Sequence, residues 1–390
     1  MTDGPLAGLL IADFSRVLAA PYATMLLADL GAEVIKVERP GTGDDTRAWG
    51  PPHVAGEAVY YLSVNRNKRS IALDLTDPAG LAAARELALR ADVLVENFRP
   101  GLMARYGLDH GSLKDANPGL VYCSISGFGS GAGAALPGYD LLVQAVGGLM
   151  SVTGPGPGEP TKAGVALVDV LTGLHAAIGI LSALRHRDAT GDGQLIEVNL
   201  LGTLLSSMVN QSANYLMAGV VPGIMGNRHP SIAPYEVFPA ADRPIVLAVG
   251  NDRQFAALAE AVGSPGLATD PRFRTNTDRV AHVDELASLL GEKLRARGAD
   301  DWFELLTPLG VPCGPVNTLA EAFGLAERLG LEPRVPGDTV RNPIGLSATP
   351  PTYRRPAPHL GEHTGEILTS LLGLSEREVS RLRSHGIVGA

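Results

Sequence analysis

The sequence predicts an α/β protein: a large domain with a doubly wound parallel sheet, together with a smaller α+β domain. Short β-rich runs alternate with helical runs over the first third of the chain, which is the pattern of right-handed βαβ units. The length of 390 residues exceeds one ordinary core and predicts about two domains. A composition of 45% hydrophobic and 19% charged residues excludes a disordered chain.

The first third of the chain supplies most of the predicted sheet. We expect strands where short apolar runs lie between turn signals, at 9–13, 32–38, 70–75, 92–98 and 119–129. A helix is expected at 20–31, with Pro21 near its first turn. Another is expected at 77–91, opened by Asp77 and Pro78. In such a sheet, ligands bind where the carboxyl ends of the strands face the loops.

A long apolar run at 164–184 approaches the ~20 residues that a membrane span needs. Asp169 and His175 lie inside it and would make insertion costly. We therefore expect a buried strand end followed by a core helix at about 171–187. A carboxylate then lies within an almost wholly apolar stretch.

The second half of the chain divides at 220–235, a segment rich in Gly and Pro that marks a domain boundary or an ordered loop. The expected elements are a strand at 193–200 and a helix at 201–219 before it, and a hairpin at 236–250 with helices at 252–263, 279–297 and 300–309 after it. Prolines gather again at 342–364, before a leucine-rich helix, so we expect the C-terminal tail to wrap over the large domain. Residues 1–219 together with 330–390 then form the large domain, and 220–329 the small domain with its linkers.

Net charge and composition disfavour several classes of protein and site. The net charge is -9 and no basic tail is present, which disfavours binding to nucleic acid. Two cysteines, Cys123 and Cys313, cannot build a disulfide framework, and the N-terminus lacks a basic region, so we expect a cytoplasmic protein. The nine histidines include no H-E-x-x-H pattern, so we expect no metal site.

Asp169 is the first candidate for chemistry. A carboxylate among apolar neighbours must be hydrogen-bonded, paired with a charge, or shifted toward its neutral form. One interpretation is an N-cap of a helix that begins near Val170. The other is a nucleophile, and the two are compatible because the field of a helix N-terminus keeps a carboxylate ionised.

A glycine-rich stretch at 126–140, which closes with Tyr139 and Asp140, is the second candidate. It could bring backbone N–H groups close to a ligand, or it could be a mobile surface loop. Its glycines alternate and do not fit the dinucleotide pattern G-x-G-x-x-G. Basic residues after the predicted strands could instead hold a polyphosphate, unless they are merely solvated: Arg39, Arg47, Arg66, Lys68, Arg69, Arg99 and Arg105.

Several segments together resemble the family III CoA-transferases. They are 14–47, 65–75, 96–105, 138–154, 168–194, 226–238, 310–317 and 359–368, and they cover nearly the whole chain in the family's order. The resemblance implies a Rossmann-like large domain made from both chain ends, a small central domain, and a homodimer of two interlocked chains. It also implies acyl-CoA and a carboxylic acid as substrates, with no permanently bound cofactor. The acidic charge balance leads us to expect no nucleic-acid partner, and Asp169 and His175 inside the apolar run lead us to expect no membrane partner.

The resemblance assigns roles to individual residues. Asp169 inherits the role of the nucleophile, which forms first an aspartyl anhydride and then an aspartyl-CoA thioester. Arg39 would meet the phosphates of coenzyme A, and the remaining contacts fall on Leu73 and Leu75 near the adenine, on Asn97, Phe98 and Arg105, on Tyr139 near the pantetheine end, and on Gly138 beside the thioester.

Departures from the family pattern bear on the substrate. Leu18 stands where formyl-CoA transferases carry a glutamine, and 229–232 replaces their glycine-rich flap, so we expect a larger and less polar acyl group than formate or oxalate. Succinyl-CoA is the donor that family habit suggests, with Arg47 or His229 available to a second carboxylate.

Two alternatives remain open at this point. The first is a 2-methylacyl-CoA racemase, a related enzyme that carries a histidine where Tyr139 stands, directly before Asp140. Racemisation needs a base on each face of the α-carbon, and histidine serves that role better than tyrosine, so transfer is preferred. The second alternative is a protein that binds CoA esters without catalysis.

Overall fold

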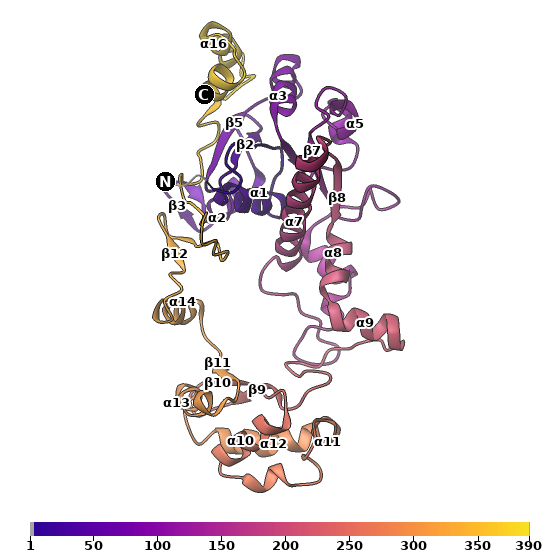
Figure 1. Ribbon diagram of the computed structural model, residues 1–390, viewed down its shortest axis with the longest axis vertical. Coiled ribbons are helices and arrows are strands. Elements are labelled where there is room, and N and C mark those ends of the chain that lie inside the picture. The colour runs from indigo at the N-terminus through magenta and orange to yellow at the C-terminus, as the bar shows by residue number, and fades with distance from the viewer. Residues whose placement is uncertain (1–3, 390) are drawn as a thin grey trace. The chain divides into compact units, whose positions relative to one another are not determined.

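The computed structural model describes residues 4–389 and is shown in Figure 1. The chain divides into two compact units. The larger unit contains the chain up to Leu149, Ala163–Val220 and the segment from Arg334 onward. The second unit contains Met150–Lys162 and Val221–Pro333.

A six-stranded parallel sheet forms the centre of the larger unit. Its strands are β1 (Leu10–Asp13), β2 (Glu33–Glu38), β5 (Lys68–Ala72), β6 (Val93–Glu96), β7 (Val121–Ser126) and β8 (Leu195–Asn199). They lie in the order β5-β2-β1-β6-β7-β8, and every neighbouring pair is parallel. The predicted parallel α/β sheet is thus confirmed. Its order reverses between β1 and β6, which makes the gap beyond their carboxyl ends the expected ligand site.

Helices cover both faces of this sheet. One face packs against α1 (Ala19–Asp29), α6 (Asp140–Val146), α7 (Leu167–Thr190) and α8 (Leu200–Ser207). The other packs against α3 (Pro78–Arg90), α4 (Leu102–Arg105), α5 (His110–Leu113), α15 (Thr364–Glu366) with the π-helical turn that follows it, and α16 (Glu376–Ser384). Neighbouring residues of each strand divide between the two cores, as the alternation of side chains along a strand requires: Ile11 enters one and Ala12 the other.

The C-terminal segment returns to the edge of the sheet. The Asp74 N–H donates to the Ile387 carbonyl at 2.9 Å, and Leu73 forms a β-bridge with Val388. Short elements complete the larger unit: β3 (His53–Val54), β4 (Glu57–Ala58), α2 (Val59–Ser63), α9 (Val209–Ala218), β12 (Arg334–Val335) and β13 (Thr339–Val340).

The second unit is built on an antiparallel sheet in the order β11-β10-β9. Its elements are β9 (Tyr235–Pro239), β10 (Pro244–Ala248), β11 (Cys313–Pro315), α10 (Asp252–Ala261), α11 (Asn276–Ala281), α12 (Val283–Leu294), α13 (Ala299–Leu306) and α14 (Leu319–Arg328). Phe238, Phe255 and Trp302 are buried in its core. This is the α+β composition that the sequence predicts for a smaller domain.

Three predicted elements are wrong in detail. No strand precedes α7, which begins at Leu167 because a side chain from α6 satisfies its first N–H groups. The helix predicted at 201–219 is two helices, broken at Val209, whose φ is 37°. The helix predicted at 279–297 is likewise divided at His282 into α11 and α12.

Helix α7 is long and apolar enough to cross a membrane when judged by length and composition alone. In the structure its inner residues Ala176, Ile180 and Ala183 are buried in the core against α1 and the sheet. An added Cβ on Gly173 would lie 2.5 Å from the Ala19 carbonyl oxygen, so the two helices approach closely there.

Candidate active site

The loops after β1 and β6 meet at the point where the strand order reverses. Segment Ser15–Leu18 follows β1, and Asn97 follows β6. Two cavities adjoin this segment, and Arg16, Asp45 and Phe98 line both. The architecture therefore gathers candidate ligand contacts where a doubly wound sheet places them.

The first cavity, of about 940 Å³ with its mouth open to solvent, contains the candidate nucleophile. Seven residues singled out from the sequence line it: Leu18, Asn97, Phe98, Arg99, Gly138, Tyr139 and Asp169. Leu18 is nearly buried, whereas the Tyr139 side chain is largely exposed. The structure thus brings together residues that lie up to about 150 positions apart in the sequence.

The second cavity, of about 790 Å³, adjoins the first. It is lined by four of the residues assigned to coenzyme A: Arg39, Leu73, Leu75 and Phe98. Leu73 is buried and Arg39 is exposed, so an apolar wall lies near an exposed cation. Arg105 lies exposed at the end of α4 and lines neither cavity.

Asp169 lies in the first turn of α7 but does not cap that helix. The N-cap is Ala166, which makes no capping hydrogen bond through its side chain. The cap comes from α6: one carboxylate oxygen of Asp140 accepts from the Val168 N–H at 2.8 Å and from the Asp169 N–H at 3.2 Å. The N-cap interpretation of Asp169 is therefore wrong, because a side chain distant in sequence satisfies these donors.

Asp140 is itself held in place by a buried amide. The Gln144 Nε2 donates to the other Asp140 oxygen at 2.5 Å, and the Gln144 Oε1 accepts from the Ala163 N–H at 2.9 Å. Two side chains from one turn of α6 thus fix the segment that leads into α7, at Ala163, and the first turn of α7, at Val168 and Asp169. The backbone around Asp169 is positioned by side chains, which leaves its own carboxylate available for other contacts.

The electrostatic surroundings favour the neutral form of Asp169. Burial and, second, the neighbouring Asp140 carboxylate raise the pKa of Asp169 to about 7. Tyr60 lies in the same surroundings: its pKa is raised by burial and then by the carboxylates of Asp169 and Asp140. Asp169 is therefore poised to ionise near neutral pH, in the range where acids and bases of enzymes operate.

The glycine-rich stretch is folded back on itself at the cavity wall. A Cβ on Gly127 would lie 2.5 Å from the Gly138 Cα, and a Cβ on Gly138 would lie 2.5 Å from the Gly127 Cα. Only glycine fits both positions without moving the backbone. The Ser126 Oγ also accepts from the Gly129 N–H at 3.0 Å, so this part of the stretch is an ordered turn.

Most of the basic residues proposed for a polyphosphate are engaged inside the protein. Lys68 pairs with Asp13, Arg66 with Asp29, Arg47 with Glu38 and Glu57, and Arg69 with Glu33 and Glu366. Arg47 is therefore not placed to meet a second substrate carboxylate. Arg39, Arg99 and Arg105 are the exposed members of the set.

His229 belongs to the second unit. Its N–H donates to the Tyr235 carbonyl at 3.1 Å, and its ring lies 5.2 Å from the Tyr235 ring. The His229 Nδ1 accepts from the Ser231 N–H at 3.0 Å. These contacts fix the turn at the start of β9.

Several residues that shape the site were not found from the sequence. Gln144 and the buried pair Lys36 and Asp44 are the main ones. A signal for Lys36 existed: a lysine in the middle of the apolar strand β2 must be paired when buried. The spacing of Asp140 and Gln144, four residues apart on one helix, is a similar local signal.

Comparison with known proteins places the chain in a family. The family model described as CoA-transferase family III matches residues 6–364. The chain is 45% identical over 384 residues to the succinate–glutarate CoA-transferase of Agrobacterium fabrum, covering 94% of this chain and 96% of that protein. It is 42% identical over 397 residues to the human succinyl-CoA:glutarate CoA-transferase, covering 98% of this chain and 90% of the human protein.

A solved structure and a further sequence relative support the same family assignment. The crystal structure of a CAIB/BAIF family protein from Brucella suis is 42% identical and superposes with a TM-score of 0.86, over 95% of this chain and 100% of that one. An acetyl-CoA:oxalate CoA-transferase from Acetobacter aceti is also 42% identical, over 365 residues that cover 92% of this chain and 94% of that protein. The family model, these relatives and the fold together show that the chain belongs to CoA-transferase family III.

Proposed function

We propose that this protein is a CoA-transferase that moves coenzyme A from a dicarboxylic acyl-CoA to a free dicarboxylic acid, with Asp169 as the nucleophile. The observation that carries the proposal is the position of Asp169: an ionisable carboxylate at the start of α7, in a cavity beside the switch point of the sheet. The residues proposed for the chemistry all belong to the larger unit.

The reaction proceeds in two balanced halves. The ionised Asp169 carboxylate attacks the thioester carbonyl, which breaks the C–S bond and gives a mixed anhydride and CoA thiolate. The thiolate then attacks the aspartyl carbonyl of the anhydride, releasing the first acid and leaving an aspartyl-CoA thioester. The acceptor carboxylate repeats these steps in reverse and regenerates Asp169. Each intermediate is about as activated as the thioester it replaces, so covalent catalysis divides the transfer into accessible steps.

The cavities divide the coenzyme between them in this proposal. The cavity with Leu73, Leu75 and Arg39 takes the adenine end, and Phe98, which lines both cavities, lies where the two meet. Tyr139 and Gly138 are placed for the pantetheine end and the thioester, close to Asp169. The transfer consumes no redox equivalents, so no cofactor besides the CoA substrate enters the scheme.

For the substrates we propose succinyl-CoA as donor and glutarate as acceptor. Relatives from Agrobacterium fabrum and human carry succinate or succinyl-CoA together with glutarate in their names. Leu18, an apolar side chain in the cavity wall, suits the methylene chain of a dicarboxylate better than a compact polar acid. Arg99, an exposed cation in the same wall, can meet a distal carboxylate.

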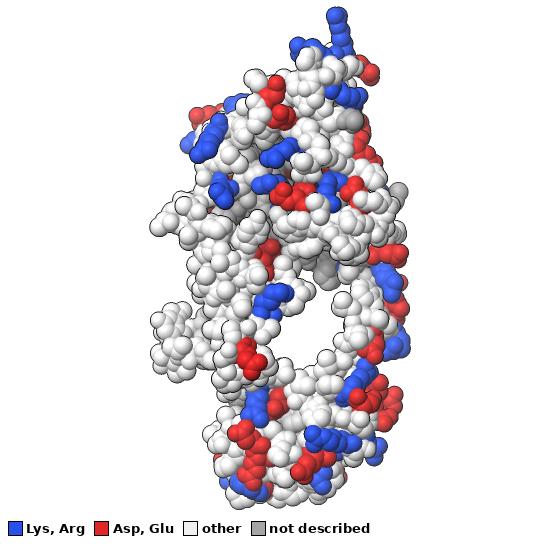
Figure 2. Space-filling model, turned by 180° about the vertical axis from the view of Figure 1, so that it is seen from behind, with Lys and Arg blue, Asp and Glu red and all other residues white. Residues whose placement is uncertain are grey.

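We also propose that two chains form a homodimer. Exposed apolar side chains lie on α7, α8 and α9, among them Ile178, Leu205, Leu216 and Met217; Leu216 is 78% and Met217 89% exposed. Figure 2 shows the region of α9, at the left edge of that view, without charged side chains. Large apolar patches of this kind mark interaction surfaces.

Cys123 and Cys313 are both free thiols, which supports a reducing, cytoplasmic location.

Mass spectrometry of single turnovers tests the proposed function. With succinyl-CoA and glutarate, the wild-type protein should form glutaryl-CoA, and hydroxylamine should convert Asp169 to a hydroxamate during turnover. Asp169→Asn should lose transfer by about a thousandfold or more. Asp188→Asn changes an exposed carboxylate near the other end of α7 and should leave both results intact. Transfer by Asp169→Asn, or a hydroxamate elsewhere, would refute the proposal.

A further inference from the structure

The segment between β1 and α1 has an unusual backbone. Val17 has φ 70°, in the left-handed region that branched side chains rarely adopt. Leu18 follows as the N-cap of α1 and makes no capping hydrogen bond through its side chain. A strained conformation of this kind persists only where the surroundings hold it. Arg16, Val17 and Leu18 also line the cavity that contains Asp169, so the position of this segment bears on the site.

Three side chains from other parts of the larger unit hold this segment, one residue each. The Ser15 carbonyl accepts from Lys36 Nζ at 2.9 Å. The Asn97 amide forms two hydrogen bonds with the Arg16 backbone: its Oδ1 accepts from the Arg16 N–H at 2.8 Å, and its Nδ2 donates to the Arg16 carbonyl at 2.7 Å. The Asp44 carboxylate accepts from the Val17 N–H, with both oxygens 3.3 Å from the nitrogen.

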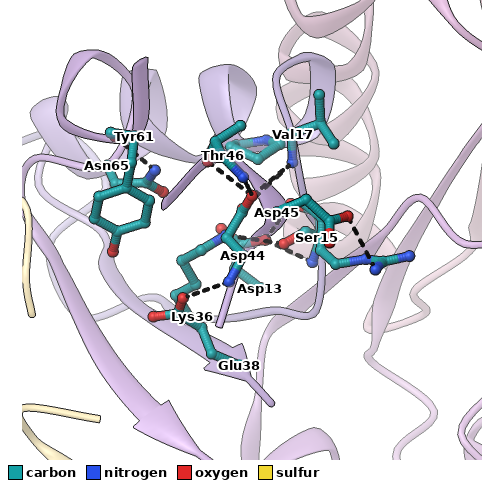
Figure 3. A network of polar contacts seen from close by, with 12 residues as sticks. Asp13, Ser15, Val17, Lys36, Glu38, Asp44, Asp45, Thr46, Tyr61 and Asn65 are labelled. Atoms are coloured by element: carbon teal, nitrogen blue, oxygen red, sulfur yellow. Dashed lines mark hydrogen bonds and ion pairs between the residues drawn. The ribbon is translucent and has the colours of Figure 1, made fainter. Parts of the chain in front are cut away.

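Lys36 and Asp44 are themselves a buried ion pair, with 2.8 Å between Lys36 Nζ and an Asp44 oxygen and both side chains inaccessible to solvent. Thr46 donates to Asp44 through its N–H at 2.9 Å and through its hydroxyl at 2.8 Å. Burial opposes ionisation, but Lys36 and Thr46 together hold the pKa of Asp44 at about 2. Figure 3 shows Asp44 between Lys36, Thr46 and the Val17 backbone. The acceptor for the Val17 N–H is thus a fixed charge.

We propose that Asp44, anchored by Lys36, is a positioning residue that holds Val17 in its left-handed conformation and so sets the place of Leu18 beside Asp169. Asn97 holds the same segment, because both the oxygen and the nitrogen of its amide bond to the Arg16 backbone. We call Asp44 and Asn97 together the clamp on Ser15–Leu18. The clamp acts on the reaction through the segment and does not touch the reacting atoms. Its effect on turnover rests on the proposed transferase function.

The test compares two buried carboxylates. Asp44→Asn keeps the shape of the side chain but removes the charge that Lys36 and Val17 share. Asp29→Asn is the matched control: Asp29 is equally buried and pairs with Arg66 at 2.7 Å, but none of its hydrogen bonds reaches Ser15–Leu18. Both variants should melt at lower temperature. Asp44→Asn should also lower kcat at least tenfold per titrated active site, whereas Asp29→Asn should leave kcat within twofold.

Hydrogen exchange at the Val17 amide reads the segment without relying on turnover. Exchange should accelerate at least tenfold in Asp44→Asn and remain unchanged in Asp29→Asn. Val17→Pro covers the case in which Asp44→Asn does not fold, because proline has no N–H for Asp44 and cannot adopt φ 70°. It should lower kcat at least tenfold while the protein stays folded.

The outcomes separate the two proposals. A wild-type protein without transfer activity refutes the proposed function, while exchange at Val17 still decides whether Asp44 holds the segment. If the wild-type protein is active, any one of three results would refute the proposed role of Asp44. These results are a wild-type kcat in Asp44→Asn, a wild-type exchange rate of the Val17 amide in that variant, and a wild-type kcat in folded Val17→Pro. Adding Val17→Gly to Asp44→Asn should recover part of kcat without recovering the melting temperature, because glycine adopts the left-handed conformation unaided.

Discussion

Asp140 accepts the N–H of Asp169 at 3.2 Å while its negative charge helps to raise the pKa of the Asp169 carboxyl to about 7. One carboxylate therefore does two opposing things to the other: it fixes the backbone and it disfavours the reactive ionised form. A nucleophile with a raised pKa is more basic and more nucleophilic once ionised, at the cost of a smaller ionised fraction below neutral pH.

The rate of aspartyl-CoA formation should therefore rise with pH and level off above about pH 7, since burial and Asp140 raise the pKa of Asp169 to about 7. Asp140→Asn keeps an oxygen acceptor for α7 but removes the charge, so its profile should move to lower pH. Single-turnover rates between pH 5 and 9 measure both profiles. A profile that does not move in Asp140→Asn would show that Asp140 acts only as a cap.

The same pKa predicts a stability effect with a definite sign. The folded-state pKa of Asp169, about 7, lies above its ordinary value of 3.8. Folding therefore favours the protonated acid, and stability is lost as pH rises from about 4 through 7. Asp169→Asn removes this cost and should be more stable at pH 8 by on the order of 1 kcal/mol, discounted because the side chain is partly exposed.

Thermal melting at pH 5 and pH 8 measures this difference. Asp169→Asn should gain about 2–4 °C over the wild-type protein at pH 8 and little at pH 5. Asp188→Asn, on the exposed surface of the same helix, should show no such pH-dependent gain. An equal gain at both pH values would contradict the assigned cause, because an effect of packing does not titrate.

Gly138→Ala tests the backbone contact at the cavity wall. The new Cβ would lie 2.5 Å from the Gly127 Cα, so the turn must open. We expect kcat/KM for the acyl-CoA to fall at least tenfold, with a modest loss of stability. Gly131→Ala is the control in the same stretch, because nothing lies within 4 Å of its added Cβ. Steady-state kinetics compare the two, and equal activity would show that the contact is dispensable.

The sequence was a good guide to elements with local signals. The strands of the parallel sheet follow from apolar runs between turns, and α3 begins at Pro78 after a capping Asp77, as its pattern predicts. The start of α7 was missed because its cap, Asp140, lies 29 positions from Asp169 and no local pattern connects them. Resemblance to a family supplied the roles of Leu73 and Leu75, which as single leucines carry no signal for a ligand.

The basic residues show most clearly what the sequence alone does not predict, namely which side chains are exposed and which are paired inside the protein. Arg47, Arg66, Lys68 and Arg69 look in sequence like Arg39 and Arg99, since all follow or begin predicted strands. Which of them is exposed depends on whether a carboxylate distant in sequence lies opposite, as Asp13 does for Lys68 at 3.0 Å. Such pairings are set by the register of neighbouring strands and by the loops, and a residue pattern does not encode them.

The apolar surface on α9 gives the last prediction, about assembly. Leu216 is 78% exposed on a helix without charged residues, and the neighbouring Met217 is 89% exposed. Replacing Leu216 by Glu places a charge in the proposed interface at little cost to the isolated chain, because the side chain is already exposed. Light scattering should find a dimer for the wild type and a monomer, or at least tenfold weaker association, for Leu216→Glu. Val54→Glu alters an exposed apolar residue on β3, away from α7–α9, and should remain dimeric. A wild-type monomer, or an undisturbed dimer in Leu216→Glu, would show that this surface is not where two chains meet.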